Sequence, residues 1–340
     1  MGRKKKQKKL NENLKKLICV ILFLIMSFIC AKTDTLENID NAIANTGLAD
    51  IVDTSDTSTV PTVAGIKLNK EVIESVSKNI VIDNTKLNIL FFDVGQADCQ
   101  LILYNGKSVL IDAGNSGDGE YIVNGLNALG IEKLDYVIGT HVHEDHVGGM
   151  SKIIDSFEIG EFYLPYDTIT TTTYYKKLLT SLTQKEMSIT EANVGDTFAV
   201  EEVRFEIMSV DNTEPDNANL SSIVLEMTYG DLKYLFMGDA EKENEKLRGW
   251  NDVDVLKVGH HGSNTSTSQE FLEQVRPEIS IISVGEGNSY ELPKNKILNR
   301  LENIGTSIYR TDKDGTIQII SDGKMNEIVK IDINFDSSKN

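Results

Sequence analysis

The sequence predicts a layered domain of the α/β (α+β) class, and two observations predict it. Short apolar runs separated by turns recur from Leu87 onward, and such runs are typical of strands. Stretches with the period of an amphipathic helix lie between some of them. Strands interspersed with helices bury their apolar faces best in layers, so we expect sheets covered by helices.

The elements can be placed in chain order. Strands are predicted over Leu87–Val94, Gln100–Tyr104, Lys107–Gly114, Leu134–Gly139, Val203–Val210, Ser221–Tyr229, Leu232–Asp239, Asp254–His261 and Ile279–Gly285. Helices are predicted over Glu120–Leu129, Tyr174–Gln184, Lys242–Arg248, Ser268–Val275 and Lys294–Ile304. Residues 85–335 are therefore expected to form the folded domain, with residues 336–340 as a tail.

The N-terminal segment, residues 1–31, has the layout of a secretory signal. A lysine-rich head precedes the uncharged apolar run Leu17–Ala31, which is short for a full span of the bilayer. Cleavage after Ala31, lipidation at Cys30 and an uncleaved signal anchor remain as alternatives. Each of them predicts an extracytoplasmic body that is secreted or held on the outer face of the cytoplasmic membrane through residues 17–31.

Residues 32–84 are expected to be a weakly structured leader. Asp53–Thr62 is rich in threonine, serine and aspartate and contains a proline, as linkers often are. Two weakly apolar patches, Ile39–Ala44 and Lys70–Ile80, predict short helices within it.

The charge of the chain is unevenly distributed. The net charge is −18; eight basic residues and one acidic residue give residues 1–31 a charge of +7, so residues 32–340 carry −25. Such an acidic body repels polyanions over most of its surface. Any phosphate chemistry must therefore be local to a metal ion or a small basic pocket.

The histidines are concentrated at predicted strand ends. Three of the five lie in the stretch THVHEDHVGG, which contains His141, His143, Asp145 and His146, and the other two are adjacent in VGHHGS. Imidazole and carboxylate groups are the ligands that divalent first-row metals select. Further predicted strand ends supply Asp93, Asp98, Asp112 and Asp239. If these ends converge on one rim, the sequence predicts a metal site there.

The series FFDVGQAD, LIDAG, THVHEDHVGG, MGDA and LKVGHHGS resembles the metallo-β-lactamase superfamily. Within it, the series is most similar to the hydrolase domain of ComEC-type DNA-uptake competence proteins. The stretches NLSSIVL, VGEGNSYELP and YRTDKDGTIQI extend the resemblance over residues 87–320. The resemblance implies an αββα sandwich with a metal site along one edge, holding one or two divalent ions, zinc or manganese.

The resemblance also implies roles for individual residues. His141 and His143 would bind one ion, and Asp239 would bridge it to a second. The second ion would be bound by Asp145 and His146 with His260 beside them. His261 would face the substrate or support the ligands, and Asp145 or Asp239 would orient the attacking water. The residues expected to support the metal ligands or to contact the substrate are Asp93, Asp98, Asp112, Asn219, Ser222, Lys257, Ser263 and Tyr290.

Two departures from the family pattern concern this site. Many members have another histidine that completes the first metal position, but this chain has no histidine from 147 to 259. The first position therefore has at most His141, His143 and Asp239 from the protein, and a single ion is as compatible with the sequence as two. The competence-type pattern also often has histidine where this chain has Leu292.

We therefore expect a hydrolase that uses metal-bound hydroxide, because a zinc-type ion lowers the pKa of its water to about 7. The resemblance favours a phosphodiester substrate: nucleic acid, a teichoic-type polymer or a small molecule. A lactonase, β-lactamase or other carbonyl hydrolase on the same scaffold is one alternative. A non-catalytic, metal-stabilised surface binding module is another. No obligate protein partner is indicated.

Overall fold

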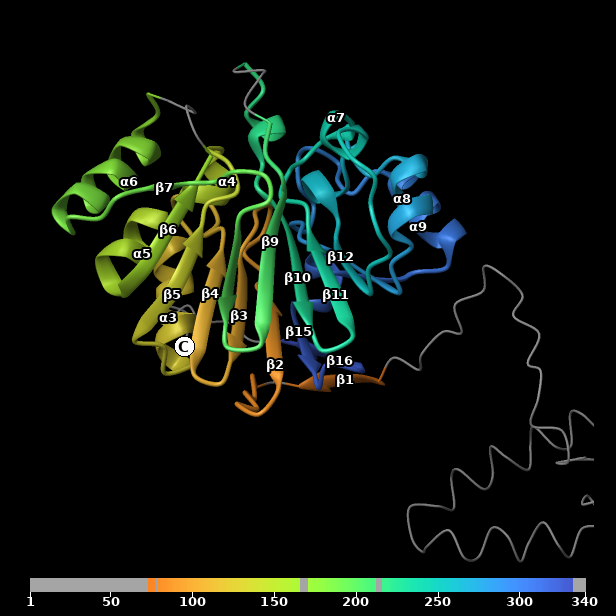
Figure 1. Ribbon diagram of the computed structural model, residues 1–340, viewed down its shortest axis with the longest axis horizontal. Helices are drawn as coiled ribbons and strands as arrows, with labels where there is room; N and C mark the ends of the chain where they lie inside the picture. Colours follow the sequence, from red (N-terminus) through yellow and green to blue (C-terminus); the bar gives the residue numbers. More distant parts are fainter. Residues whose placement is uncertain (1–72, 78, 166–170, 212–215, 333–340) are drawn as a thin grey trace, which may run out of the picture. The chain divides into compact units, whose positions relative to one another are not determined.

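The computed structural model describes residues 73–77, 79–165, 171–211 and 216–332, which all belong to one unit of the chain. Two mixed β-sheets face each other, and helices cover both outer faces (Figure 1). This helix–sheet–sheet–helix order confirms the predicted fold class. The signal-like segment, most of the leader and the tail lie outside the described residues.

The first sheet has nine strands, in the spatial order β1 (Ile73–Ser77), β16 (Asn326–Ile331), β15 (Thr316–Ser321), β2 (Leu87–Phe91), β3 (Gln100–Tyr104), β4 (Lys107–Ile111), β5 (Lys133–Ile138), β6 (Glu158–Leu164) and β7 (Thr190–Glu191). The second has seven, in the order β14 (Ser307–Arg310), β13 (Ile279–Ile282), β12 (Val255–Lys257), β11 (Leu232–Phe236), β10 (Val224–Tyr229), β9 (Val203–Ser209) and β8 (Thr197–Val200).

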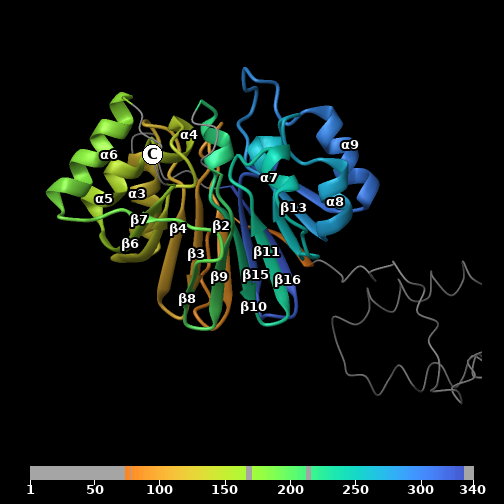
Figure 2. The same cartoon turned by 45° about the horizontal axis from the view of Figure 1, so that its top comes forward.

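The helices fall into two groups, one on each outer face (Figure 2). Beside the first sheet are α3 (Gly119–Ala128), α4 (Glu144–Val147), α5 (Met150–Ser156) and α6 (Thr173–Gln184). Beside the second are α7 (Lys242–Lys246), α8 (Gln269–Val275) and α9 (Asn295–Ile304). A short helix α10 (Thr311–Asp314) links β14 to β15, and two 3₁₀ turns are η2 (Ala218–Ser221) and η3 (Gly259–Gly262). In the part of the chain that is described, no helix is both long and apolar enough to cross a membrane.

Alternation along the strands separates the cores. In β2, Leu87, Ile89 and Phe91 belong to the core between the two sheets, whereas Leu90 belongs to the core under the helices. Successive side chains of a strand point to opposite faces, so one strand serves both layers. A third core joins the second sheet to α8 and α9.

The topology brings strand ends of both sheets to one edge. β4, β5 and β6 are parallel, and so are β11, β12, β13 and β14. Their carboxyl ends lie at the upper edge in Figure 1, where α4 is found. The predicted strands run a few residues too far at this edge, because their last residues belong to the loops that build the site.

The predicted helix near Lys70–Ile80 is wrong for Ile73–Ser77. These residues form β1, which pairs in parallel with β16 at the outer edge of the first sheet. The sheet thus begins within the range assigned to the leader. The conformation of this segment is determined by main-chain pairing with a strand that is distant in sequence. The weak local apolar pattern contains no information about that pairing.

Candidate metal centre

Three predicted ligands, Asp145, His146 and Asp239, meet His261 at the edge where the strand ends converge. Each offers one atom, and these atoms all lie within 4.8 Å of one another. His146 Nε2 is 3.2 Å from Asp239 Oδ1. His261 Nε2 is 3.3 Å from Asp145 Oδ2 and 3.6 Å from Asp239 Oδ1. The chain thus gathers two imidazole nitrogens and two carboxylates from three loops that are far apart in sequence.

The atoms that converge here fit a divalent cation. His146 Nε2, His261 Nε2 and Asp239 Oδ1 are all buried and have no hydrogen-bond partner among the described residues. A buried polar atom without a partner is costly, so several of them facing one point fit a site that binds a cation. Nitrogen and carboxylate oxygen donors suit zinc and related first-row ions.

The electrostatics of the cluster also call for positive charge. Burial alone would lower the pKa of His146, but the carboxylates of Asp239 and Asp112 outweigh it and hold this pKa well above its usual value. Against the effect of burial, Asp239 likewise raises the pKa of His261. Burial would raise the pKa of Asp239, yet the neighbouring imidazoles hold it well below its usual value. Protons on the two histidines therefore provide the charge that a bound cation would supply.

Asp112 orients one of these histidines. Its Oδ2 lies 2.8 Å from His146 Nδ1, and it accepts hydrogen bonds from the backbone N–H and the hydroxyl of Thr140, both at 2.8 Å. Burial raises the pKa of this carboxyl. Because His146 Nδ1 is engaged, Nε2 is the atom left to coordinate an ion.

A buried ion pair lies behind the other histidine. Lys257 Nζ is 2.7 Å from Asp98 Oδ2, and both side chains are 1% exposed. Asp98 Oδ1 is 3.5 Å from His261 Nδ1, which also lies 2.9 Å from the carbonyl oxygen of Ser283. Lys257 therefore neutralises Asp98 inside the fold, and of the two roles that the resemblance left open for it, this contact agrees with support of the site.

His141 and His143 lie beside the cluster and near each other. His141 Nε2 is 3.0 Å from His143 Nδ1 and 4.0 Å from Asp239 Oδ2. On its other side, His141 Nδ1 lies 3.4 Å from the Ser222 hydroxyl, which accepts a hydrogen bond from the backbone N–H of Asp239. Burial lowers the pKa of His141, which favours the neutral, ligating form of the ring.

The two adjacent histidines take positions opposite to those expected. The family comparison by motif placed His260 beside Asp145 and His146, with His261 outside the ligand set. In the structure His261 joins those two residues, while His260 Nε2 lies 3.6 Å from the other oxygen of Asp239. The physical reason is the backbone: both histidines have positive φ, so their side chains leave the turn in directions that motif spacing does not reveal.

The remaining predicted residues divide between the rim and other roles. Asn219 donates to Glu241 Oε1 at 3.2 Å, and that oxygen is 3.4 Å from His260 Nδ1. Ser263 bonds within its own loop, its hydroxyl 3.2 Å from that of Thr265. Asp93 caps its own turn by accepting from the N–H of Gly95.

Tyr290 is 66% exposed, and none of the contacts found for it in the described chain involves the metal cluster.

Sequence reasoning missed three supporting residues. Thr140 fixes Asp112, and Thr265 and Glu241 contact His260 Nδ1. The only feature of the sequence that could have identified these three residues is their position, since each lies within five residues of a predicted ligand.

The glycines of the histidine motif act through close approach. Gly148 and Gly149 have ordinary helical φ values of −58° and −82°, so no left-handed turn requires glycine at these positions. A Cβ at Gly149 would collide with the carbonyl oxygen of Ala113, and one at Gly148 with Ser116 N. Their absence of side chains lets the loop after β4, which carries Asp112, pack directly beside His146.

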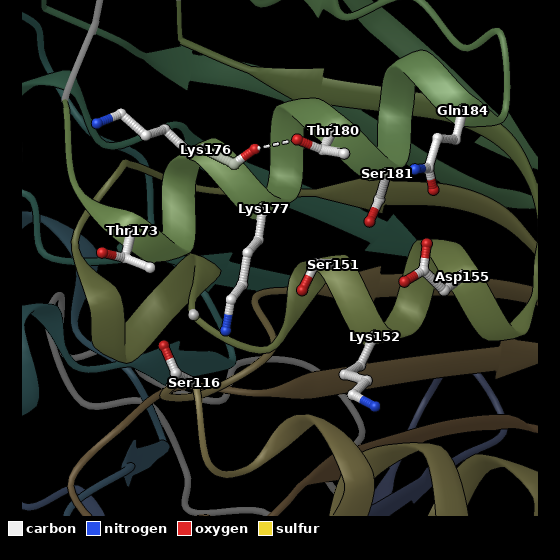
Figure 3. A pocket seen from close by; sticks show the side chains of 11 residues that line it. Ser116, Ser151, Lys152, Asp155, Thr173, Lys176, Lys177, Thr180, Ser181 and Gln184 are labelled. Carbon is white, nitrogen blue, oxygen red and sulfur yellow. Dashed lines mark hydrogen bonds between the residues drawn. The ribbon is translucent and has the colours of Figure 1, made fainter.

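A hollow of about 480 Å³ lies next to the motif, between α5 and α6 (Figure 3). Its lining includes three lysines, Lys152, Lys176 and Lys177, together with serine and threonine hydroxyls and the carboxylate of Asp155. The first turn of α6 is tied to the motif, because the Tyr174 hydroxyl donates to the carbonyl oxygen of Val142 at 3.1 Å.

Comparison with known proteins supports the resemblance found by motif. ComE operon protein 3 of Bacillus subtilis is 32% identical over 248 residues, which are 66% of this chain and 32% of that protein. Recombination protein 2 of Haemophilus influenzae is 33% identical over 234 residues, 67% of this chain and 28% of that protein. The chain thus spans about a third of the length of these curated relatives.

One solved structure is similar to part of this chain. The metallo-β-lactamase fold protein YhfI from Bacillus subtilis aligns over 68% of this chain and 99% of its own, with a TM-score of 0.47 and 9% identity. The family model described as metallo-beta-lactamase superfamily matches residues 92–286, which contain all four residues of the cluster as well as His141, His143 and His260. The chain belongs to the metallo-β-lactamase superfamily.

Proposed function

We propose that this chain is a metal-dependent hydrolase of phosphodiester bonds. The observation that supports it most is the four-residue cluster, in which buried nitrogen and oxygen atoms without partners face one point. An ion of the zinc or manganese type bound there would polarise a phosphoryl oxygen and supply a nucleophile from water at neutral pH. The residues around it orient the ligands and hold the charges in place.

Asp145 is the ligand best placed to meet the attacking water. Its side chain is 29% exposed, whereas those of His146, Asp239 and His261 are almost completely buried. Burial would raise its pKa, but His146 and His261 lower it well below the usual value, so the carboxylate is ionised at neutral pH. An ionised, partly exposed carboxylate can accept a hydrogen bond from water and fix its direction of attack.

Two observations favour a phosphodiester over a lactone or β-lactam. One relative, recombination protein 2 of Haemophilus influenzae, is named for recombination, and this favours nucleic acid as the substrate. The hollow beside the motif offers lysines and hydroxyls, which are the side chains that contact phosphate most often, on a chain that is otherwise strongly acidic. We also propose that the protein lies outside the cytoplasmic membrane, and the signal-like pattern of residues 1–31 supports this.

The test is hydrolysis of bis-p-nitrophenyl phosphate by the full chain, purified in mild detergent and supplied with zinc or manganese. We expect turnover that is abolished by His143→Ala and by Asp239→Asn, with far-ultraviolet circular dichroism showing that both variants fold. The same protein is also tested on a lactone and a β-lactam, and hydrolysis of these instead of the phosphodiester would favour the carbonyl-hydrolase alternative. Metal binding with no turnover on any of these substrates would favour the non-catalytic binding module. Failure to bind either metal would contradict the proposal that the chain is a metal-dependent enzyme.

A further inference from the structure

We infer that the hollow between α5 and α6 binds one nucleotide of a single-stranded nucleic acid, apart from the metal cluster that acts on the strand. The phosphate of this nucleotide would lie at the end of the hollow near Ser116, and its sugar and base would extend toward Asp155. The inference rests on the proposed function and deepens it, because it makes the substrate a strand of several nucleotides and assigns the site that holds the strand.

Three polar side chains that line the hollow have no partner in the part of the chain that the structure describes. Ser181 is 5% exposed and points from α6 toward α5 in Figure 3, yet no described residue forms a hydrogen bond with its hydroxyl. The ammonium group of Lys177 and the hydroxyl of Ser151 are likewise unpaired among the described residues. A polar side chain as buried as Ser181 normally has a partner, so we expect that partner to be a ligand in the hollow.

Positive charge gathers at the start of α6. Thr173, the first residue of this helix, lines the hollow, and Lys176 and Lys177 follow shortly after it. The first turn contains no acidic residue, and the side chain of Thr172 does not cap it. The N-terminus of a helix carries a partial positive charge, which adds to the charge of the lysines. A negatively charged group is therefore favoured at this end of the hollow.

The two ends of the hollow differ in their chemistry. In Figure 3 the side chain of Lys177 extends toward Ser116, where the chain is so close that a Cβ at Gly148 would lie 2.4 Å from Ser116 N. Asp155 and Gln184 line the opposite end. A carboxylate repels phosphate, but together with an amide it suits the hydrogen-bonding groups of a sugar or a base. The volume of about 480 Å³ lies within the range of sites for small ligands, so there is room for one nucleotide.

The hollow and the metal cluster share one short segment of the chain. Gly148 lines the hollow and follows His146, a member of the cluster, by two residues. The Tyr174 hydroxyl donates to the carbonyl oxygen of Val142 at 3.1 Å, so the start of α6 is fixed to the histidine motif. A strand bound in the hollow is thereby held in a constant position relative to the cluster. Such positioning favours reaction at another phosphate of the same strand.

The experiment measures the affinity of the full chain, purified in mild detergent and free of metal, for a fluorescent thymidine hexanucleotide by anisotropy. Ser181→Val places a larger apolar side chain in the hollow without changing the charge, and we expect it to weaken binding about tenfold. Lys177→Ala removes one charge and should weaken binding several-fold. Because Lys177 is an exposed residue, this second variant keeps the test decisive if Ser181→Val fails to fold.

The matched controls are Thr183→Val and Lys185→Ala, which make similar changes on the same helix and at its C-terminal end, outside the hollow. Thr183 is exposed, and its hydroxyl donates to the carbonyl oxygen of Leu179 at 2.7 Å. Both controls should bind as tightly as the wild-type chain. Every variant keeps the basic residues 1–31, so any binding by that segment is the same in each. Losses in the two controls equal to those in the two hollow variants would overturn the inference.

An oligomer of glycerol phosphate with the same number of phosphates tests whether the ligand is a nucleotide. We expect it to bind more weakly than the hexanucleotide, because it has no base to reach Asp155 and Gln184, and equal affinity would overturn the assignment to a nucleotide. Weakened binding in Ser181→Val, with no hydrolysis of any phosphodiester by the metal-loaded wild-type chain, would contradict only the proposed function. Hydrolysis of the hexanucleotide by a chain whose binding neither hollow variant weakens would contradict only this inference.

Discussion

Lys257 is a buried cation next to a cluster that itself attracts cations. Its ammonium group contacts Asp98 Oδ2 at 2.7 Å and the carbonyl oxygen of Val258 at 3.1 Å. A lysine is rarely buried this completely unless it is paired. The pair removes the charge of Asp98 from the cluster, and without it Asp98 would be a further buried carboxylate beside His261.

Replacing Lys257 with methionine should therefore destabilise the chain strongly. Removing one partner of a buried pair leaves the other charge uncompensated, at a cost of about 3–5 kcal/mol in the free energy of unfolding. Urea denaturation of the metal-free protein measures it. The double variant Lys257→Met, Asp98→Asn should recover part of the loss, because no unpaired charge remains. A loss below about 1 kcal/mol in the single variant would contradict the pairing.

Residue type and spacing predicted which side chains form the centre, but could not separate His260 from His261. All five histidines, Asp145 and Asp239 do come together, since strand ends project them to one edge. Which of two neighbouring rings points at Asp145 depends on backbone torsions that no motif encodes. Thr140 and Glu241 escaped notice for a similar reason, because hydrogen-bonding partners of a ligand have no fixed spacing from it.

Strands and helices were predictable where their burial is uniform. β2, β3 and β4 are almost wholly buried and appear in the sequence as short, mostly apolar runs. β6 begins with exposed residues, and β16 contains polar residues between its apolar ones. Neither strand therefore stands out in the sequence as an apolar run. The order in which the strands pair could not be predicted from the sequence, because β15 pairs with β2 from more than two hundred residues away.

The helix pair α5 and α6 forms the wall of the hollow beside the histidine motif. Lys177 extends from α6 toward α5 in Figure 3, and the structure shows no ion pair for it with any described carboxylate. Lys152, by contrast, lies 3.6 Å from Glu120. If the substrate is a phosphodiester, as we propose, we expect Lys177 to be the lysine of the hollow that meets its phosphate.

Reversing this charge should weaken binding of a polyanion. For Lys177→Glu we expect a several-fold loss of affinity for a single-stranded oligonucleotide and a salt dependence shallower by about one unit of slope. Fluorescence anisotropy on metal-free protein measures binding without cleavage. Lys324→Glu changes the same charge on the exposed β15–β16 turn, away from the hollow, and should have little effect. Equal losses in both variants would show that net charge alone is responsible.

The chain as a whole carries more acidic than basic side chains, and acidic side chains also predominate at the metal centre. Asp112, Asp145 and Asp239 surround His146, whose pKa they raise against the effect of burial. In the metal-free chain the balance is restored by protons on His146 and His261. Ions and protons therefore compete for the same nitrogen atoms, and stability becomes linked to both pH and metal concentration.

This competition predicts opposite responses to pH in the two forms of the protein. Histidines whose pKa is raised in the folded state contribute stability that is complete below the unfolded value of about 6.5 and is lost as the pH rises through the folded pKa. His146 and His261 are both of this kind. The pKa of His141 is lowered, so this residue reduces the stability of the fold only at acidic pH. It therefore does not offset the loss of stability above pH 6.5. The melting temperature of metal-free protein should therefore fall between pH 6 and pH 9.

With saturating zinc the trend should be absent or reversed, because a bound ion needs deprotonated ligands and alkaline pH removes the competing protons. The gap in melting temperature between the zinc-loaded and metal-free forms should widen steadily across this range, as measured by differential scanning fluorimetry. In His261→Gln one of the two histidines responsible is gone, so the metal-free decline should be shallower. A gap that stays constant with pH would mean that protons and metal do not share these nitrogens.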